Sequence, residues 1–269
     1  MFYSVHKSQR AELAKAGWDS LDVGTEMVVN PNEWQTRGKK WQDVRTAINK
    51  AKRDGITDVL TTFKEAPFSV QTQIREISAQ WAGKKALPEM GFTLGGVDEL
   101  IDSRVRLLYA VDGNGKVLGV TSWLPTYRDG TIIGWTLDFM RHRTDSVNGI
   151  MEFLIARMAE RLRDEGNVEF MSLSAAPLAG MGSNESEHEE SEVLRHALQM
   201  VADIMEPAYG FHSLFRFKLK FHPDEEKVYI CYPDAAKLPQ ISLAVAQAYV
   251  PSLTPAEAMR FVRTIAPRD

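Results

Sequence analysis

The feature of the sequence that most constrains the fold is an amphipathic helical segment between two strand-like runs. Residues Asn148–Gly166 repeat apolar side chains at helical spacing, with Ile150, Phe153, Leu154, Met158 and Leu162 on one face. Gly166 is a typical residue for a helix end. Runs rich in β-formers precede and follow this segment, at Thr131–Met140 and Val168–Ser174. Such a strand–helix–strand unit predicts a sheet with helices packed on it.

The rest of the chain mixes a hairpin with further strands and helices. Arg106–Val111 and Lys116–Trp123 are β-rich runs on either side of the turn Asp112–Gly115, which predicts a hairpin. Further strands are expected at Thr25–Asn30, Ile56–Phe63 and Val228–Tyr232, and further helices at Lys39–Gly55, Pro67–Ala82, Ser191–Met205, Leu238–Tyr249 and from Pro255. We therefore predict the α/β (α+β) class with a mixed sheet. No GxGxxG or Walker lysine loop occurs, which disfavours a dinucleotide-binding fold.

Composition limits the possible functions. The 269 residues carry 32 basic and 36 acidic side chains, and the net charge of −4 excludes a uniformly basic nucleic-acid coat. Cys231 is the single cysteine, which excludes an intrachain disulfide and fits a cytoplasmic location. The six histidines lack metal-ligand spacing, so we predict no metal site.

Basic residues are concentrated in one segment of this acidic chain. Arg37–Arg53 contains seven basic residues and one acidic residue, a local charge of +6. Arg45, Lys52 and Arg53 fall on one side of the predicted helix. This face is either a solvated helix surface or a surface that contacts the phosphates of a polyanion such as tRNA.

A series of short motifs runs in order along most of the chain. They are Glu89–Gly95, Trp123–Pro125, Leu137–Arg141 (LDFMR), Asn148–Ile155, Ser172–Gly180 (SLSAAPLAG), Phe211–Phe221 and Tyr229–Pro233. Together they resemble the C-terminal catalytic domain of the aminoacyl-phosphatidylglycerol synthases, also called phosphatidylglycerol lysyltransferases or multiple peptide resistance factors.

This resemblance implies a tandem GNAT-like acyltransferase fold. It implies transesterification, in which an amino acid passes from aminoacyl-tRNA to a lipid hydroxyl, usually that of phosphatidylglycerol. No cofactor is implied, neither acetyl-CoA nor a metal. The implied partners are aminoacyl-tRNA, an anionic phospholipid and a membrane surface, which indicates the cytoplasmic face of the membrane.

The chain also departs from the family. Met1–Val5 resembles a strand in the middle of the first acyltransferase half, so we expect a fragment or a shortened relative that lacks the family's membrane-spanning N-terminal part. We therefore expect residues 1–84 to form a partial first GNAT-like domain with the basic helix, and residues 85–269 to form a second, catalytic one. Asp224–Lys227 stands where the family commonly has Trp-Glu-Pro.

The resemblance suggests Asp138 and Arg141 as catalytic residues. Asp138 would bind the ammonium of the amino acid, and Arg141 would hold a phosphate or steady Asp138; a structural Asp–Arg pair is the alternative. The predicted substrate-binding residues are Glu152, Ser172, Arg216, Lys218 and Lys220. The last three alternate with apolar residues, so an extended segment would present one cationic face to a phosphate. Solvated strand edges and ordinary strand serines are the alternatives, and the helix dipole alone could explain Glu152.

Two other functions remain open from the sequence. The first is a different acyltransferase on the same scaffold, either a peptidoglycan cross-bridge aminoacyltransferase or an acetyl-CoA enzyme. The acetyl-CoA version needs a glycine-rich pyrophosphate loop, which neither Gly113–Gly119 nor Leu178–Gly182 provides. The second is a non-catalytic fragment that binds tRNA or a membrane.

Overall fold

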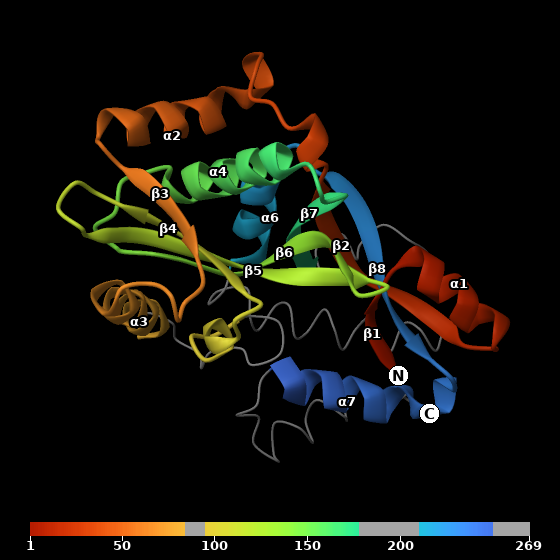
Figure 1. The fold of residues 1–269 in the computed structure, drawn as a ribbon. Helices are drawn as coiled ribbons and strands as arrows, with labels where there is room; N and C mark the ends of the chain where they lie inside the picture. The colour runs from red at the N-terminus through yellow and green to blue at the C-terminus, as the bar shows by residue number, and fades with distance from the viewer. Residues whose placement is uncertain (84–94, 178–209, 250–269) are drawn as a thin grey trace.

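The computed structural model describes residues 1–83, 95–177 and 210–249, which form one mixed sheet with helices packed on it (Figure 1). The strands are β1 (Phe2–Val5), β2 (Asp19–Val29), β3 (Thr57–Thr61), β4 (Arg106–Val111), β5 (Val117–Arg128), β6 (Thr131–His142), β7 (Phe170–Pro177) and β8 (Asp224–Tyr232). The helices are α1 (Lys7–Lys15), α2 (Gln42–Arg53), α3 (Phe68–Ala82), α4 (Ile150–Glu165), α6 (Phe211–Leu219) and α7 (Leu238–Tyr249). The helices predicted at residues 191–205 and from residue 255 lie outside the described residues.

The sheet is continuous from end to end, in the order β1-β8-β2-β7-β6-β5-β4-β3. All neighbouring strands are antiparallel except β6 and β7, which are parallel. The predicted mixed sheet is thus confirmed. Strands from both sides of residue 84 pair within it, as β3 does with β4. The predicted units 1–84 and 85–269 are therefore continuous in structure, and their division stays a prediction.

Helices cover the sheet on two faces. α2 and α4 lie side by side over one face, and α3 lies on the other (Figure 1). The apolar stripe predicted for α4 is buried in the larger core, while α3 buries Val70, Ile74 and Ile77 in a second core. Gly149 precedes α4 with a φ of 90°, and a Cβ built there would lie 2.9 Å from Cβ of Ala47. Glycine thus lets α2 approach the start of α4.

The extended form considered for Leu214–Phe221 is not the one that the segment adopts. Its side chains do not alternate along a strand, because residues 211–219 form α6. The alternation of basic and apolar side chains fits either structure, since Leu214, Phe217 and Phe221 also recur at helical spacing. In a helix Arg216 and Lys220 share a face and Lys218 lies away from it. The single cationic face that an extended segment would present therefore does not form.

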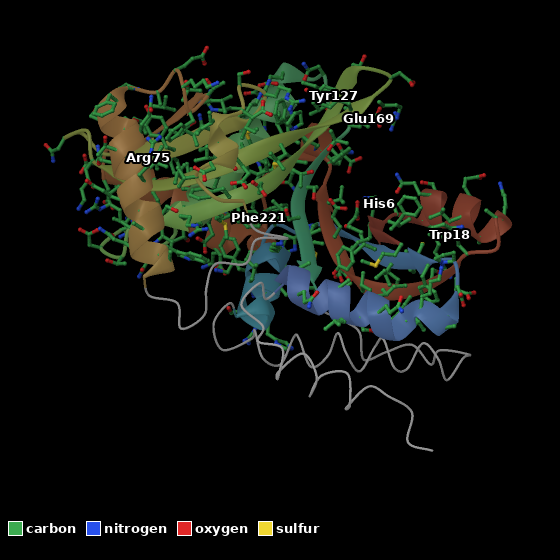
Figure 2. All side chains as sticks on the ribbon, turned by 90° about the horizontal axis from the view of Figure 1, so that it is seen from below. His6, Trp18, Arg75, Tyr127, Glu169 and Phe221 are labelled. Atoms are coloured by element: carbon green, nitrogen blue, oxygen red, sulfur yellow. The ribbon has the colours of Figure 1, made fainter. Side chains whose placement is uncertain are left out.

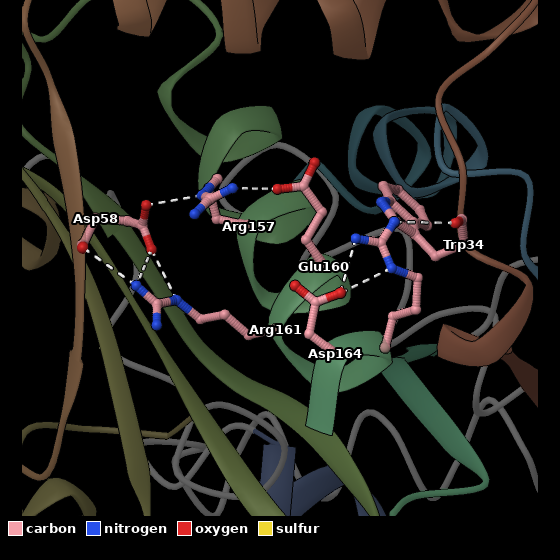
Figure 3. A network of polar contacts seen from close by, with 7 residues as sticks. Trp34, Asp58, Arg157, Glu160, Arg161 and Asp164 are labelled. Carbon is pink, nitrogen blue, oxygen red and sulfur yellow. Dashed lines mark hydrogen bonds and ion pairs between the residues drawn. The ribbon is translucent and has the colours of Figure 1, made fainter. Parts of the chain in front are cut away.

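An ion-pair network fastens strand β3 to helix α4 (Figure 3). Both carboxylate oxygens of Asp58 accept hydrogen bonds, one from Nε of Arg157 at 2.8 Å and the other from Nε of Arg161 at 2.8 Å. Arg157 also pairs with Glu160, one helical turn further on. The side chain of Asp58 is only 8 % exposed. The network holds the edge strand of the sheet to the central helix.

Replacement of Asp58 should therefore destabilise the fold. We expect Asp58→Ala to lower the free energy of unfolding by about 1–3 kcal/mol, because two guanidinium groups lose a buried partner but are one-third exposed to water. Chemical denaturation measures the change. The control is Asp164→Ala, which removes an exposed carboxylate paired with Arg163 and should cost about 0.5 kcal/mol or less. Equal effects of the two substitutions would contradict the role given to Asp58.

Candidate active site

A cavity with several ionisable side chains in its wall opens where the parallel strands β6 and β7 separate. Their pairing ends at Thr136 and Ser172, although both strands continue beyond these residues. The space between them belongs to a cavity of about 1080 Å³, which is large enough for a drug-sized ligand. Its ionisable wall residues from the strands and helices include Glu26, Asp138, Arg141, Glu152 and Lys218.

A β-bulge in β6 brings Asp138 and Arg141 to the same side of the sheet. In a regular strand, residues three apart point to opposite faces. Here Thr121 pairs with Met140 but Trp123 pairs with Leu137, so Asp138 and Phe139 both lie opposite Ser122. The hydroxyl of Ser122 accepts the N–H of Phe139 at 3.1 Å. Such a bulge resets the alternation of side chains.

The segment at Gly95 contacts both members of this pair. The backbone N–H of Gly95 donates to the carboxylate of Asp138, and its carbonyl lies 3.5 Å from Nη2 of Arg141. The Arg141 guanidinium is buried and lies 3.6 Å from the ring centroid of Trp81, a cation–π contact. Arg141 is therefore held in place by an aromatic ring and a backbone carbonyl.

Burial changes the acidity of Asp138. Removal from water raises the pKa of its carboxyl, and the negative charge of Glu99 raises it further. The Gly95 hydrogen bond and the charge of Arg141 act in the opposite direction, but the net pKa shift is upward. A carboxylate that has lost much of its hydration binds a cationic ligand strongly.

The raised pKa predicts the pH dependence of any reaction that needs ionised Asp138. As the pH falls through the raised pKa, the carboxylate becomes neutral and can no longer pair with an ammonium. We expect kcat/KM for such a reaction to fall with decreasing pH, with a midpoint above 3.8, the ordinary pKa of an aspartate. A pH–rate profile measures this. A rate that stays constant down to about pH 4 would contradict the prediction.

Lys218 reaches the cavity from helix α6. The residue is 3 % exposed, and its ammonium donates to the carbonyl oxygens of Ser174 at 3.1 Å and Ala175 at 3.2 Å. Burial lowers its pKa to about 7, while the charge of Glu26 opposes this shift. Near neutral pH the Lys218 amine can therefore exchange a proton.

Glu152 and Lys220 form an ion pair beside the cavity. Glu152 lies in the first turn of α4, and its Oε1 is 2.8 Å from Nζ of Lys220. The positive end of the helix dipole also favours a carboxylate at this position. Of this pair, the carboxylate is the member that lines the cavity.

The other two predicted substrate-binding residues lie differently from expectation. Ser172 is buried, and its hydroxyl donates to the carboxylate of Glu26 while accepting the N–H of Ser174 at 3.0 Å. The Ser172 hydroxyl therefore already has one acceptor and one donor partner inside the protein. Arg216 is exposed on α6 and is not among the cavity residues.

The predicted tRNA-binding residues divide into two kinds. Arg45 donates to the carbonyl oxygens of Thr36 and Gly38, both at 2.5 Å, so it holds the loop before α2. Lys52 and Arg53 are exposed at the far end of that helix. Only these two have side chains directed to solvent.

The sequence motifs did not identify Glu26, Tyr3 or Trp81 as cavity residues. Each lies outside the motifs and comes from an element preceding residue 84. Within the described ranges, no group of three His, Cys, Asp or Glu side chains could hold a metal ion. No helix in the same part of the chain combines the length and apolarity required to cross a bilayer.

The mixed sheet and its splayed parallel pair, with a cavity between the two strands, define a GNAT-like α/β fold. Residues 1–232 match the family model described as "Phosphatidylglycerol lysyltransferase, C-terminal", and the chain belongs to that family.

Two curated relatives and one solved structure illustrate the similarity. An uncharacterized protein of Corynebacterium glutamicum is 41% identical over 93% of this chain and 31% of its own length. The phosphatidylglycerol lysyltransferase of Bacillus subtilis is 29% identical over 86% of this chain and 26% of its own. The chain thus spans about a quarter to a third of these relatives. The structure of L-PGS from Bacillus licheniformis has a TM-score of 0.72 and 24% identity, with 92% of this chain and 72% of that chain covered.

Proposed function

We propose that this chain carries the catalytic site for transfer of an aminoacyl group from aminoacyl-tRNA to a hydroxyl of phosphatidylglycerol. The lipid oxygen attacks the carbonyl carbon of the aminoacyl ester and forms a new ester bond. The bond to the terminal ribose of the tRNA breaks, and the lipid hydroxyl proton passes to the ribose oxygen. The donor ester is already activated, so binding and orientation supply much of the required catalysis.

The observation that carries this proposal is the shared cavity of Asp138, Arg141 and Lys218. Asp138 offers a partly desolvated carboxylate to the ammonium of the aminoacyl group. Arg141 steadies that carboxylate or pairs with a phosphate. Lys218, with a pKa of about 7, is suited to proton exchange between the two hydroxyl oxygens.

The test is a transfer assay with the full chain. Transfer RNA charged with a radiolabelled amino acid is mixed with phosphatidylglycerol vesicles, and the lipids are extracted and counted. Separate arms with lysyl-, alanyl- and arginyl-tRNA identify the amino acid, and vesicles of a neutral lipid test the acceptor. Label in the phosphatidylglycerol extract supports the proposal, while its absence with every charged tRNA rejects it.

A peptidoglycan cross-bridge transferase is the alternative enzyme on this scaffold. FemX shares the fold, with a TM-score of 0.52 at 9% identity over 88% of this chain. An arm in which a peptidoglycan precursor replaces the vesicles separates the two activities. Label in the precursor and not in the lipid would favour the alternative.

The location of the protein follows from the proposed substrates. A lipid acceptor lies in a membrane and charged tRNA lies in the cytoplasm, so the site would work at the cytoplasmic face.

We expect the exposed cations of α2 to contribute to tRNA binding. The double substitution Lys52→Glu with Arg53→Glu should weaken tRNA binding about tenfold and reduce its salt dependence, because fewer counterions are released from the phosphates. Filter binding at several salt concentrations measures both effects. The control is Lys15→Glu, on α1, where the ammonium already pairs with Glu12. Equal losses in the control and the double variant would contradict a specific role for α2.

A further inference from the structure

A hydrogen-bonded chain leads from the protein surface to Lys218. It begins at His6, whose Nε2 lies 3.2 Å from Oε2 of Glu26. The other carboxylate oxygen of Glu26 accepts the hydroxyl of Ser172. Ser172 accepts the N–H of Ser174, and the carbonyl of Ser174 accepts the ammonium of Lys218. In Figure 2, His6 lies toward the same end of the sheet as Trp18.

The middle of this series of hydrogen bonds is a β-bulge in β7, where the backbone makes a strained turn at Ser174. Glu26 pairs with Ala175 and Val28 pairs with Ser172, so Leu173 and Ser174 together lie opposite Met27. Ser174 has a φ of 65°, in the left-handed region that favours glycine. Its hydroxyl donates to the carbonyl of Leu137 across the gap between the parallel strands. Surrounding contacts must hold a serine in this conformation.

Glu26 itself is placed at the wall of the same cavity. Its side chain is 13 % exposed and lies on β2, the strand next to β7. Other ionisable groups around this region are His6 and Glu226 on the surface side; the cavity wall adds Tyr3, Asp138, Arg141, His142 and Glu152, the last paired with Lys220. The charge that acts on Lys218 is that of Glu26.

We infer that Glu26 is a positioning residue for Lys218: through Ser172 it fixes the turn at Ser174 whose carbonyl holds the lysine ammonium. Glu26 need not touch the substrate in this role. Its negative charge also stabilises the ammonium form of Lys218 against burial. Glu26 therefore acts in two separable ways, by charge and by holding the turn. The importance of both actions for catalysis rests on the proposed function, whereas their effect on the titration of Lys218 does not.

Two substitutions separate these actions. Glu26→Gln keeps a hydrogen-bond acceptor for Ser172 and removes the charge, while Ser172→Ala keeps the charge and removes the link to the turn. The titration of Lys218 is followed by NMR of lysine-labelled protein, with its signal assigned by its loss in Lys218→Arg. The control is Glu226→Gln, which removes the other carboxylate near His6 and none of the links to Lys218.

The inference predicts opposite shifts. In Glu26→Gln the titration of Lys218 should move down by about 0.5–1 pH unit from the wild-type value, because the ammonium loses a nearby negative charge. In Ser172→Ala it should move up, toward the ordinary lysine value, because the loosened turn admits water. Glu226→Gln should titrate like wild type. Transfer by Ser172→Ala should also show a kcat about tenfold lower with little change in KM.

The outcomes decide the inference without the transfer assay. An unchanged titration in Glu26→Gln overturns the charge effect, and an unchanged titration in Ser172→Ala overturns the link through the turn. A variant that unfolds is recognised by its melting curve, and the other variant still tests its own link. If the wild type transfers nothing but both shifts occur, the proposed function fails and the positioning of Lys218 by Glu26 stands.

Discussion

Asp138→Asn should reduce aminoacyl transfer by about 100- to 1000-fold while leaving the protein folded. The amide keeps the size and the hydrogen-bond acceptor but removes the charge that pairs with an ammonium. Loss of a charged hydrogen bond in a partly desolvated site is costly, because the substrate ammonium is left without a negative partner. We expect the loss mainly in kcat/KM for the aminoacyl-tRNA, measured at saturating lipid.

The folded state of this variant should not suffer. The carboxyl of Asp138 has a raised pKa, so its ionised form is disfavoured by burial, and a neutral amide removes that cost. Asp102→Asn is the control, because Asp102 is an exposed carboxylate whose partner is Arg104. We expect wild-type transfer from the control. Wild-type transfer from Asp138→Asn would remove Asp138 from the reaction.

Gly95→Ala should also have a large effect and lower kcat/KM for aminoacyl transfer about tenfold or more. A Cβ on this residue would lie 2.5 Å from Cγ of Asp138 and closer still to Oδ2. Either the carboxylate or the Gly95 backbone must move, and the hydrogen bond between them is lost in both cases. Arg141 would be disturbed as well, since its guanidinium lies beside the Gly95 carbonyl.

A matched glycine substitution isolates this effect. Gly113 lies in the turn between β4 and β5, where a Cβ would meet nothing within 4 Å. Gly113→Ala should retain wild-type transfer and melting temperature. Steady-state kinetics of both variants, with thermal unfolding as the measure of folding, make the comparison. Equal kinetics for the two variants would show that contact with Gly95 is unimportant for Asp138.

The regular elements could be predicted from sequence because their signals are local. The α4 stripe from Ile150 to Leu162 and the β4–β5 hairpin depend on neighbouring residues, and both formed close to the expected ends. Helix α6 was not predicted, because alternating and helical patterns cannot be told apart over so few residues. Local pattern therefore predicts long elements better than short ones.

The site could be predicted only in part because its geometry depends on contacts between distant segments. The LDFMR motif pointed to Asp138 and Arg141, but a regular strand would have separated them. The bulge that brings them together depends on the register against Ser122. The bond between Ser172 and Glu26 joins residues 146 positions apart, and no local pattern marks Glu26.

The most direct test of the account is a crystal structure with a stable donor analogue. An adenosine bearing a lysyl or alanyl group through a 3′-amide resembles the end of charged tRNA and does not react as an ester. We predict that its α-ammonium lies about 3 Å from the Asp138 carboxylate, with its carbonyl facing the space between β6 and β7. An analogue bound elsewhere, with Asp138 and Lys218 untouched, would contradict the account.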